Sequence, residues 1–255
     1  FGKKQEIDCL VGNQDVIVGG ETGQELSSTQ VFRKNNGTEP GTLDPHRAEG
    51  VPASNVLRDL FEGLIMEDPS GRYIPGAAES WTLSEDAKTY VFTMRENGKW
   101  SNGDDVTADD FIYGLRRSVD PSTLSNYSSM LYPIKNARDI VLGIKDPETL
   151  GVRSEGPKTL IIELDEPTPY FLSLLTHSTT YAAHRPTVEE FGAQFTRPGN
   201  LVGNGAFRLQ EWRVQSHIKL ARNTEYRDNK NTTLEEVYYY PIDDTNSAFK
   251  RYRAQ

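Results

Sequence analysis

Four aspartates stand close together near the middle of the chain, at Asp104, Asp105, Asp109 and Asp110. Carboxylates grouped in this way could bind calcium or act as the acid and base of a hydrolase. Calcium-binding loops alternate their ligands around a sharp glycine turn, and this spacing does not. An acid–base pair of carboxylates stays an open alternative, because the two members of such a pair can be far apart in sequence. Acidic residues also stabilise the start of a helix, and we favour that interpretation.

The other candidates for metal or nucleophilic chemistry are isolated. The four histidines are spread along the chain, at His46, His177, His184 and His217. Cys9 is the only cysteine, which excludes an intramolecular disulfide and a cysteine-rich zinc site. Residues 203–205, Gly-Asn-Gly, are more typical of a turn than of a phosphate-binding loop, and no nucleophile elbow, zinc-protease or Walker motif occurs. We therefore predict no enzyme activity, no metal site and no cofactor.

Two further segments could contact a ligand through backbone or aromatic groups. Glu49, Gly50 and Val51 form a loop in which Gly50 lacks a Cβ, so another backbone can approach it. The backbone N–H and C=O groups of extended residues beside Gly50 can pair with an incoming strand. An ordinary loop with a turn glycine explains the same residues. Tyr127, in the polar segment SNYSSM, could present its ring to a ligand or pack inside the fold.

An amphipathic helix is predicted directly after this 49–51 loop, within residues 43–64, LDPHRAEGVPASNVLRDLFEGL. Its apolar row consists of Val56, Leu60 and Leu64, spaced to form one buried face. Pro52 can start the helix, and Ser54 or Asn55 can bond an unpaired amide. The predicted helix would hold the loop in place.

A second helix is predicted within residues 97–121. Thr107 and Asp110 have the spacing of a capping box, and Asp120 with Pro121 ends the helix. Its apolar row is formed by Phe111, Leu115 and Val119. This pattern accounts for the aspartates at the helix start without a catalytic or metal-binding role.

Strands are predicted where apolar residues alternate with polar ones or form short runs. They lie at residues 89–96, 158–164 and 237–242, with two more within residues 197–223. Short helices are predicted at residues 186–192 and 246–255. Strands and helices alternate irregularly, which predicts an α/β class of the mixed α+β kind.

The composition excludes several classes of protein. The 255 residues include 28 Lys and Arg against 37 Asp and Glu, and the net charge of −9 repels nucleic acid and anionic membranes. The length suits one or two domains. No apolar run approaches the length of a membrane span, and the start lacks both an initiator Met and an apolar leader, so we expect a mature or excised chain.

Several separated segments together resemble one protein family. They are LDPHRAEGVPASNVLRDLFEGL, PGAAESW, KWSNGDDVTADDFIYGLRRSVDP, EPTPYF and RPGNLVGNGAFRL. In order and spacing they resemble the periplasmic oligopeptide-binding proteins, which are family 5 solute receptors of peptide ABC transporters. The resemblance covers roughly residues 31–255 and leaves the first thirty unmatched.

The resemblance implies a bilobal fold of the periplasmic-binding-protein-like class II. It implies a discontinuous first domain of residues 31–61 and 185–255, an inserted second domain of residues 62–184, and an extension of residues 1–30. Family members are roughly twice as long, so the chain is expected to be an N-terminal half. The lobe that supplies an aspartate for the peptide's amino group and arginines for its carboxylate would lie beyond Gln255.

The resemblance also implies a function and a binding site. Glu49, Gly50 and Val51 would line the cleft and pair with the ligand backbone, with Glu49 also facing a side-chain pocket, and Tyr127 would close from the second domain. The expected receptor is a periplasmic monomer that binds short peptides with broad specificity and delivers them to an ABC permease. A murein-peptide receptor is the alternative within the family, and a carboxylate-dependent hydrolase is the alternative from another class.

Overall fold

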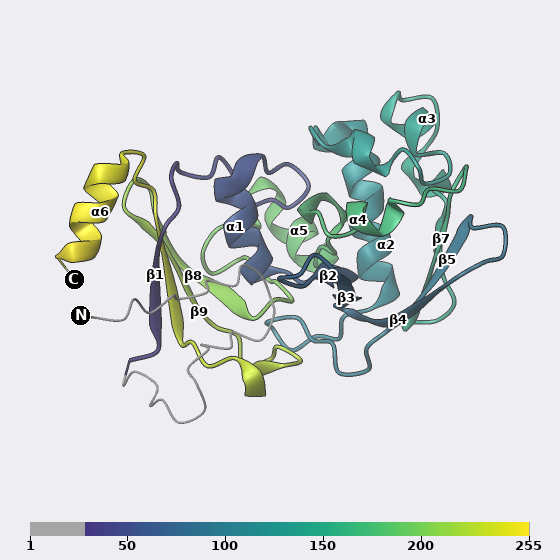
Figure 1. Ribbon diagram of the computed structural model, residues 1–255. Helices are drawn as coiled ribbons and strands as arrows, with labels where there is room; N and C mark the ends of the chain where they lie inside the picture. The colour runs from purple at the N-terminus through teal and green to yellow at the C-terminus, as the bar shows by residue number, and fades with distance from the viewer. Residues whose placement is uncertain (1–28, 255) are drawn as a thin grey trace.

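The computed structural model describes residues 29–254 (Figure 1). The extension predicted for residues 1–30, apart from its last two residues, and the lone Cys9 therefore lie outside the described residues. The strands are Val31–Asn35 (β1), Ile65–Glu67 (β2), Tyr73–Pro75 (β3), Ala78–Leu83 (β4), Thr89–Met94 (β5), Val152–Ser154 (β6), Thr159–Glu163 (β7), Phe207–Arg213 (β8), His217–Arg222 (β9) and Glu236–Tyr240 (β10).

The helices are short and are distributed over the whole described chain. The α-helices are Gly50–Leu60 (α1), Ala108–Val119 (α2), Ala137–Val141 (α3), Phe171–Leu174 (α4), Arg185–Phe191 (α5) and Thr245–Arg253 (α6). The 3₁₀ helices are Pro121–Thr123 (η1), Ser128–Leu131 (η2), Pro147–Thr149 (η3), Ser178–Thr180 (η4), Gly192–Gln194 (η5) and Asn229–Asn231 (η6). Within residues 29–254, none of these helices is long and apolar enough to cross a bilayer.

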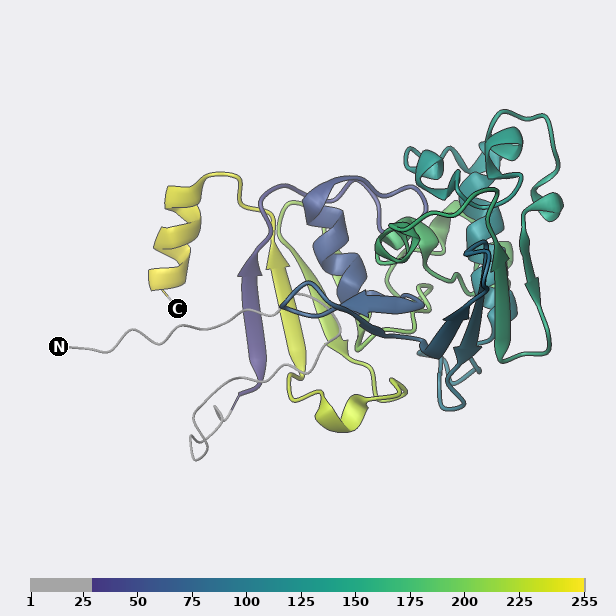
Figure 2. The ribbon, with the colours of Figure 1, turned by 45° about the vertical axis from the view of Figure 1, so that its right-hand side comes forward.

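One four-stranded sheet joins segments that are far apart in sequence. Its order is β1-β10-β9-β8, with β1 parallel to β10 and the other neighbours antiparallel. Val31 lies opposite Glu236, so the first and the last strand of the described chain are neighbours in one sheet. Helix α1 lies beside β8 (Figures 1 and 2) and buries Val56, Leu57 and Leu60.

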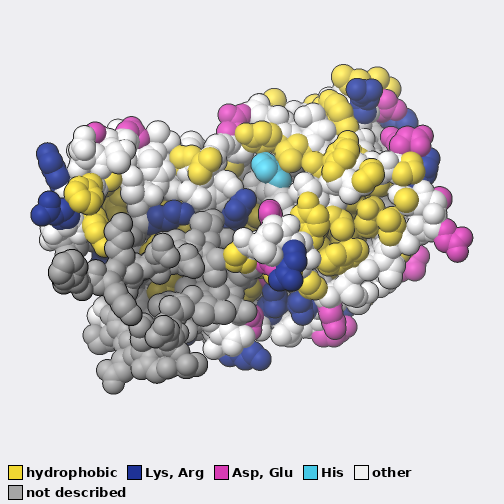
Figure 3. Space-filling view, in the orientation of Figure 1, with side chains coloured by type: hydrophobic (Ala, Val, Ile, Leu, Met, Phe, Trp, Pro, Cys, Tyr) yellow, Lys and Arg dark blue, Asp and Glu magenta, His cyan; other side chains and the backbone are white. Residues whose placement is uncertain are grey.

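A second four-stranded sheet forms the other half of the molecule, in the antiparallel order β4-β5-β7-β6. Tyr90, Phe92 and Met94 are buried, which confirms the alternation predicted for β5. Helix α2 packs against β6 and β7. The face in Figure 3 shows hydrophobic side chains gathered on this half of the molecule. Some of its apolar groups, including Tyr73 and Leu83, are exposed.

The capping box predicted at the start of α2 is confirmed. The Thr107 amide donates to Asp110 Oδ2 at 2.8 Å, and the Thr107 hydroxyl lies 2.9 Å from the same oxygen. The apolar row of Phe111, Leu115 and Val119 is buried. The helix ends at Val119, as the Asp120-Pro121 pair predicts. Because caps and helix periodicity are local properties, the sequence was sufficient here.

Helix α1 is shorter than its predicted apolar row. The backbone of Phe61 is extended, with φ −132° and ψ 152°, and the Leu60 carbonyl accepts a hydrogen bond from the Gly205 amide at 3.0 Å. Leu64 is buried, yet it follows the helix rather than belonging to it. A tertiary partner for the last carbonyl thus replaces the next helical turn.

The start of α1 also differs from the expected capping. The N-cap residue is Glu49, and neither Ser54 nor Asn55 caps the helix. Asn55 Nδ2 instead donates to Asn36 Oδ1 at 3.0 Å, while Asn36 Nδ2 donates to the Pro52 carbonyl at 2.9 Å. These bonds connect the first two turns of α1 to the residue that follows β1.

The two sheets draw on different parts of the sequence. The sheet of β1, β8, β9 and β10 uses residues 31–35 and 207–240, whereas the sheet of β4 to β7 uses residues 78–163. This is the pattern that a discontinuous first domain with an inserted second domain requires. The boundaries near residues 61 and 185 stay a prediction.

Candidate functional site

The 49–51 loop lies at the surface, but the prediction that it precedes the helix is wrong: α1 begins at Gly50 rather than at Pro52, so only Glu49 lies outside the helix. Glu49 has extended backbone angles, φ −128° and ψ 149°, and the Val51 side chain is 70% exposed. Gly50 has φ +78°, a conformation that strains residues with a Cβ. The glycine is therefore required by its backbone angle, whereas the space around its missing Cβ is open except for Pro52.

A buried polar cluster of Asp44, His46 and Arg117 holds the chain just before this loop; we call it the Asp44 cluster. Arg117, on α2, donates to both carboxylate oxygens of Asp44, at 2.7 and 2.6 Å. His46 Nδ1 lies 2.8 Å from Arg117 Nη1 and must accept, because the guanidinium can only donate. His46 Nε2 therefore carries the proton and donates to the Tyr181 carbonyl at 2.9 Å.

The electrostatics of the Asp44 cluster keep it in one protonation state at neutral pH. Burial, followed by the charge of Arg117, lowers the pKa of His46 to about 4, although Asp44 acts in the opposite direction. Burial alone would raise the pKa of Asp44, but hydrogen bonds and the charge from Arg117 outweigh it and hold this pKa below its ordinary value. The loop is thus held by an ion pair and a neutral imidazole.

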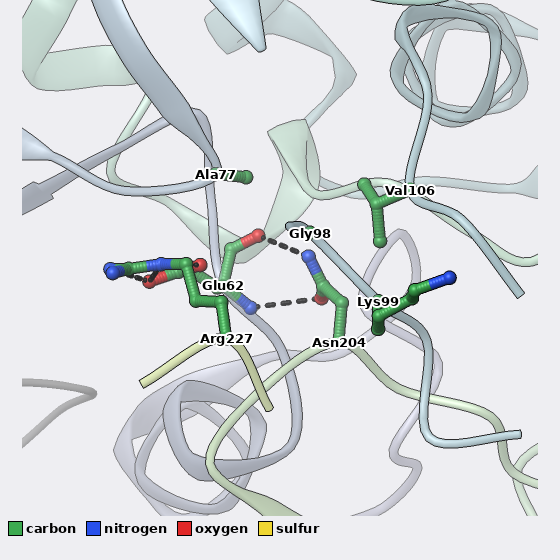
Figure 4. A pocket seen from close by; sticks show the side chains of 7 residues that line it. All are labelled: Glu62, Ala77, Gly98, Lys99, Val106, Asn204 and Arg227. Atoms are coloured by element: carbon green, nitrogen blue, oxygen red, sulfur yellow. Dashed lines mark hydrogen bonds and ion pairs between the residues drawn. The ribbon is translucent and has the colours of Figure 1, made fainter. Parts of the chain in front are cut away.

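A second buried ion pair fixes the other end of α1. The Glu62 carboxylate accepts hydrogen bonds from Arg227 Nε at 2.9 Å, Arg227 Nη2 at 2.5 Å and the Tyr226 hydroxyl at 2.9 Å. The side-chain amide of Asn204 pairs with the Glu62 backbone, accepting from its N–H at 3.0 Å and donating to its carbonyl at 2.9 Å (Figure 4). Residues in the segment after β9 and in the loop before β8 therefore hold the end of α1 in place.

The pocket beside Glu62 is too small for an organic ligand. Its volume is about 10 Å³, which has room for one water molecule at most. It is lined by Glu62, Ala77, Gly98, Lys99, Val106, Asn204 and Arg227 (Figure 4). A Cβ on Gly203 would lie 2.1 Å from the Leu60 carbonyl oxygen. The 203–205 loop thus packs against the helix end, a role that matches a turn rather than a phosphate cradle.

Helix α1 also buries one carboxyl group against the first sheet. Asp59 accepts a hydrogen bond from the Tyr239 hydroxyl, which also lies 3.2 Å from the Asn55 carbonyl oxygen. Burial raises the pKa of Asp59 to about 6, although Tyr239 and the charge of Lys34 act in the opposite direction. At neutral pH the folded chain therefore holds an unfavourable buried charge.

Replacing Asp59 with asparagine is expected to raise the free energy of unfolding at pH 7 by about 1–2 kcal/mol. Asparagine removes the buried charge and keeps an acceptor for Tyr239. The pKa of Asp59 in the folded chain lies above its ordinary value of 3.8. The aspartate therefore costs no stability below pH 3.8, and its cost grows as the pH rises to about 6 and is complete above that pH. Urea unfolding at neutral and at acidic pH measures this, and an equal gain at both would contradict the titration.

Three of the four clustered aspartates have partners within the fold that give them a structural role. Asp110 closes the capping box of α2 and also lies 3.3 Å from Trp100 Nε1. Asp109 accepts from the Ser154 hydroxyl at 2.7 Å, and Asp105 pairs with Lys99 at 2.6 Å. Among residues 29–254, no group of three or more His, Cys, Asp or Glu side chains is placed to hold a metal ion.

Asp104 takes part in an arrangement with catalytic residue types. Asp104 Oδ2 lies 3.0 Å from His184 Nε2, and His184 Nδ1 lies 2.6 Å from the Thr187 hydroxyl. An accessible nucleophile is needed for hydrolysis in such a triad, whereas Thr187 is only 6% exposed, in the first turn of α5. The arrangement ties the start of α5 to the loop before α2.

The structure brings the 49–51 loop and Tyr127 to one region. Asn126 Nδ2 donates to Glu49 Oε1, which joins the start of α1 to the segment before η2. The Tyr127 ring packs edge-on against His177, with ring centroids 4.9 Å apart, and remains half-buried. The sequence did not identify Asn126 or His177 as part of this region. Asn126 is the neighbour of Tyr127 in the chain, and His177 was considered only as an isolated histidine.

Comparison with known proteins places the chain in a family. Residues 72–255 match the family described as bacterial extracellular solute-binding proteins, family 5, middle region. The chain belongs to family 5 of the bacterial extracellular solute-binding proteins. This confirms the resemblance seen in the sequence and the α/β, periplasmic-binding-protein-like fold class.

Two relatives share two-fifths or more of the aligned residues with this chain. The periplasmic oligopeptide-binding protein OppA of Salmonella typhimurium is 44% identical over 234 residues, which cover 91% of this chain and 43% of that protein. The periplasmic murein peptide-binding protein MppA of Escherichia coli is 40% identical over 235 residues, covering 91% and 43%.

A solved family 5 structure matches the fold closely. The complex of Haemophilus influenzae OppA with RPPGFSPFR has a TM-score of 0.88 and 40% sequence identity, and the match covers 90% of this chain and 45% of that one. The chain therefore spans less than half the length of these relatives.

Proposed function

We propose that this chain supplies one wall of the binding site in an extracytoplasmic receptor for short oligopeptides. The observation that carries the proposal is the exposed start of α1, where the extended Glu49 and the first helical residues Gly50 and Val51 lie beside Asn126 and Tyr127. The first amides of a helix have no intrahelical acceptors, so those at the start of α1 can donate to a peptide backbone. Backbone pairing is common to all peptides and allows broad side-chain specificity.

The relatives support the proposal through what they bind. OppA of Salmonella typhimurium is named as an oligopeptide-binding protein of the periplasm, and the Haemophilus influenzae protein was solved with a nine-residue peptide. By analogy the receptor would act in the periplasm as a monomer and deliver its ligand to an ABC permease. MppA, named for murein peptides, supports the second candidate, a murein-peptide receptor.

Binding through the Val51 amide predicts a specific backbone variant. Val51→Pro removes that donor at a position where a helix tolerates proline, and it is expected to weaken binding of tri-alanine about tenfold. Val51→Ala shortens the side chain, keeps the amide and is the matched control. Titration calorimetry measures both variants. Equal affinity for Val51→Pro and Val51→Ala would show that the Val51 amide does not pair with the peptide.

Native mass spectrometry of the chain distinguishes the candidate functions. A mixed set of adducts that dissociate into short peptides is expected for an oligopeptide receptor, and murein peptides should predominate for the second candidate. The hydrolase alternative predicts new products when peptides or oligosaccharides are incubated with the chain, and their loss in Asp104→Asn. A solute receptor should return its ligand unchanged.

A further inference from the structure

The exposed side of α1 carries a cation beyond the 49–51 loop. Arg58 lies seven residues after Val51, which places both on the same side of the helix, two turns apart. Arg58 is exposed, and no carboxylate within residues 29–254 pairs with it. A surface arginine without a partner is available for an anion from outside the chain.

His177 offers a second donor, on the segment that packs against α1. It precedes η4, the 3₁₀ helix that packs against α1, and its Nδ1 accepts the Thr179 amide at 3.2 Å. The proton of the neutral ring is therefore on Nε2, which has no partner within the described part of the chain. Burial, and then the nearby charge of Arg58, lower the pKa of His177, which keeps the ring neutral.

Tyr127 fixes the orientation of His177. The edge-on contact of their rings, with centroids 4.9 Å apart, and the bond to Thr179 hold the imidazole from two directions. A preorganised N–H donor and a guanidinium that lie on elements packed against each other can together bind the two oxygens of a carboxylate. Glu49, the acidic group of the same region, lies at the other end of the helix and is bonded to Asn126.

We infer that Arg58 and the Nε2–H of His177 form a subsite for a carboxylate of the bound peptide. This inference rests on the proposed function and adds a chemical preference to it. Gly50 and Arg58 are about 12 Å apart along the helix, a span of roughly three to four extended residues. The carboxylate can therefore be the C-terminus of a short peptide or an acidic side chain within a longer one.

Two pairs of peptides separate these two sources. Tetra-alanine is compared with its C-terminal amide, and tetra-alanine amides with one glutamate at each position in turn are compared with the matching glutamine peptides. Calorimetry of the unmodified chain should show about tenfold tighter binding of the carboxylate member in one of the two comparisons. The comparison that shows the preference identifies the source.

Variants connect the preference to the subsite. Arg58→Gln should reduce the tenfold preference to about equal binding, whereas Arg208→Gln, which changes an exposed arginine on β8, should retain it. His177→Asn keeps an acceptor for the Thr179 amide and removes the Nε2 donor, so it should reduce the preference about threefold. Circular dichroism confirms that each variant is folded.

The possible failures are distinguishable. Peptide binding without a preference in either comparison overturns the carboxylate subsite and leaves the proposed function intact. An Arg58→Gln variant that weakens all peptides equally also overturns the subsite. If none of the peptides binds the unmodified chain, the proposed function and the subsite both fail.

Discussion

Replacing Arg227 with alanine is expected to lower the free energy of unfolding by about 3–5 kcal/mol. The change leaves the Glu62 carboxylate, in a residue only 2% exposed, without its cation and with the Tyr226 hydroxyl as its remaining side-chain donor. A buried charge that loses its partner retains its full desolvation cost. Urea unfolding followed by tryptophan fluorescence measures the loss.

Two controls test the explanation for Arg227. Arg208→Ala removes an exposed arginine and should change the stability by no more than about 0.5 kcal/mol. The double variant Glu62→Leu with Arg227→Met replaces both charges by apolar groups and should recover much of the loss. A loss in Arg227→Ala no greater than in Arg208→Ala would contradict the assigned role of the ion pair.

Replacing Arg117 with methionine is expected to have an effect of similar size, about 3–5 kcal/mol, with an additional electrostatic consequence. The change leaves the buried Asp44 carboxylate with His46 as its nearest titratable partner. Because the charge of Arg117 lowers the pKa of His46 and Asp44 raises it, this pKa should rise from about 4 in the variant. An NMR titration of the His46 ring measures the rise, and unfolding in urea measures the stability.

The neighbouring arginine provides a matched control. Arg116, also on α2, pairs with the exposed Glu148, and Arg116→Met should cost about 1 kcal/mol or less. It should leave the pKa of His46 near 4. Because the Asp44 cluster holds the chain before the 49–51 loop, Arg117→Met should also weaken tri-alanine binding, whereas Arg116→Met should not. An unchanged His46 pKa in Arg117→Met would refute the electrostatic assignment.

Local patterns in the sequence predicted the elements that position the site. The alternation in β5 and the capping box of α2 depend on residues within a few positions of one another. The order of residues in the chain is therefore enough to predict both elements. The same reasoning misjudged the end of α1, where the Gly205 amide, far along the chain, takes the last carbonyl. A contact of that kind has no local signature.

The resemblance to a family predicted more of the site than periodicity did. It selected Glu49, Gly50, Val51 and Tyr127 as ligand contacts, and these roles stay predictions. The structure shows what the resemblance did not: Asn126 joins Glu49 to the segment of Tyr127, and the rings of Tyr127 and His177 pack edge-on against each other. The structure also explains why position 50 is a glycine, because its φ angle is positive.

The sequence by itself determined the class of fold, the family, helices α1, α2, α5 and α6, and strands β5, β7, β8, β9 and β10. The tertiary structure alone decided which charges become partners. Arg117 meets Asp44 across 73 positions, and Arg227 meets Glu62 across 165. Sequence separation does not indicate such pairs, because their strength comes from burial and geometry, which exist only once the sheets and helices have packed.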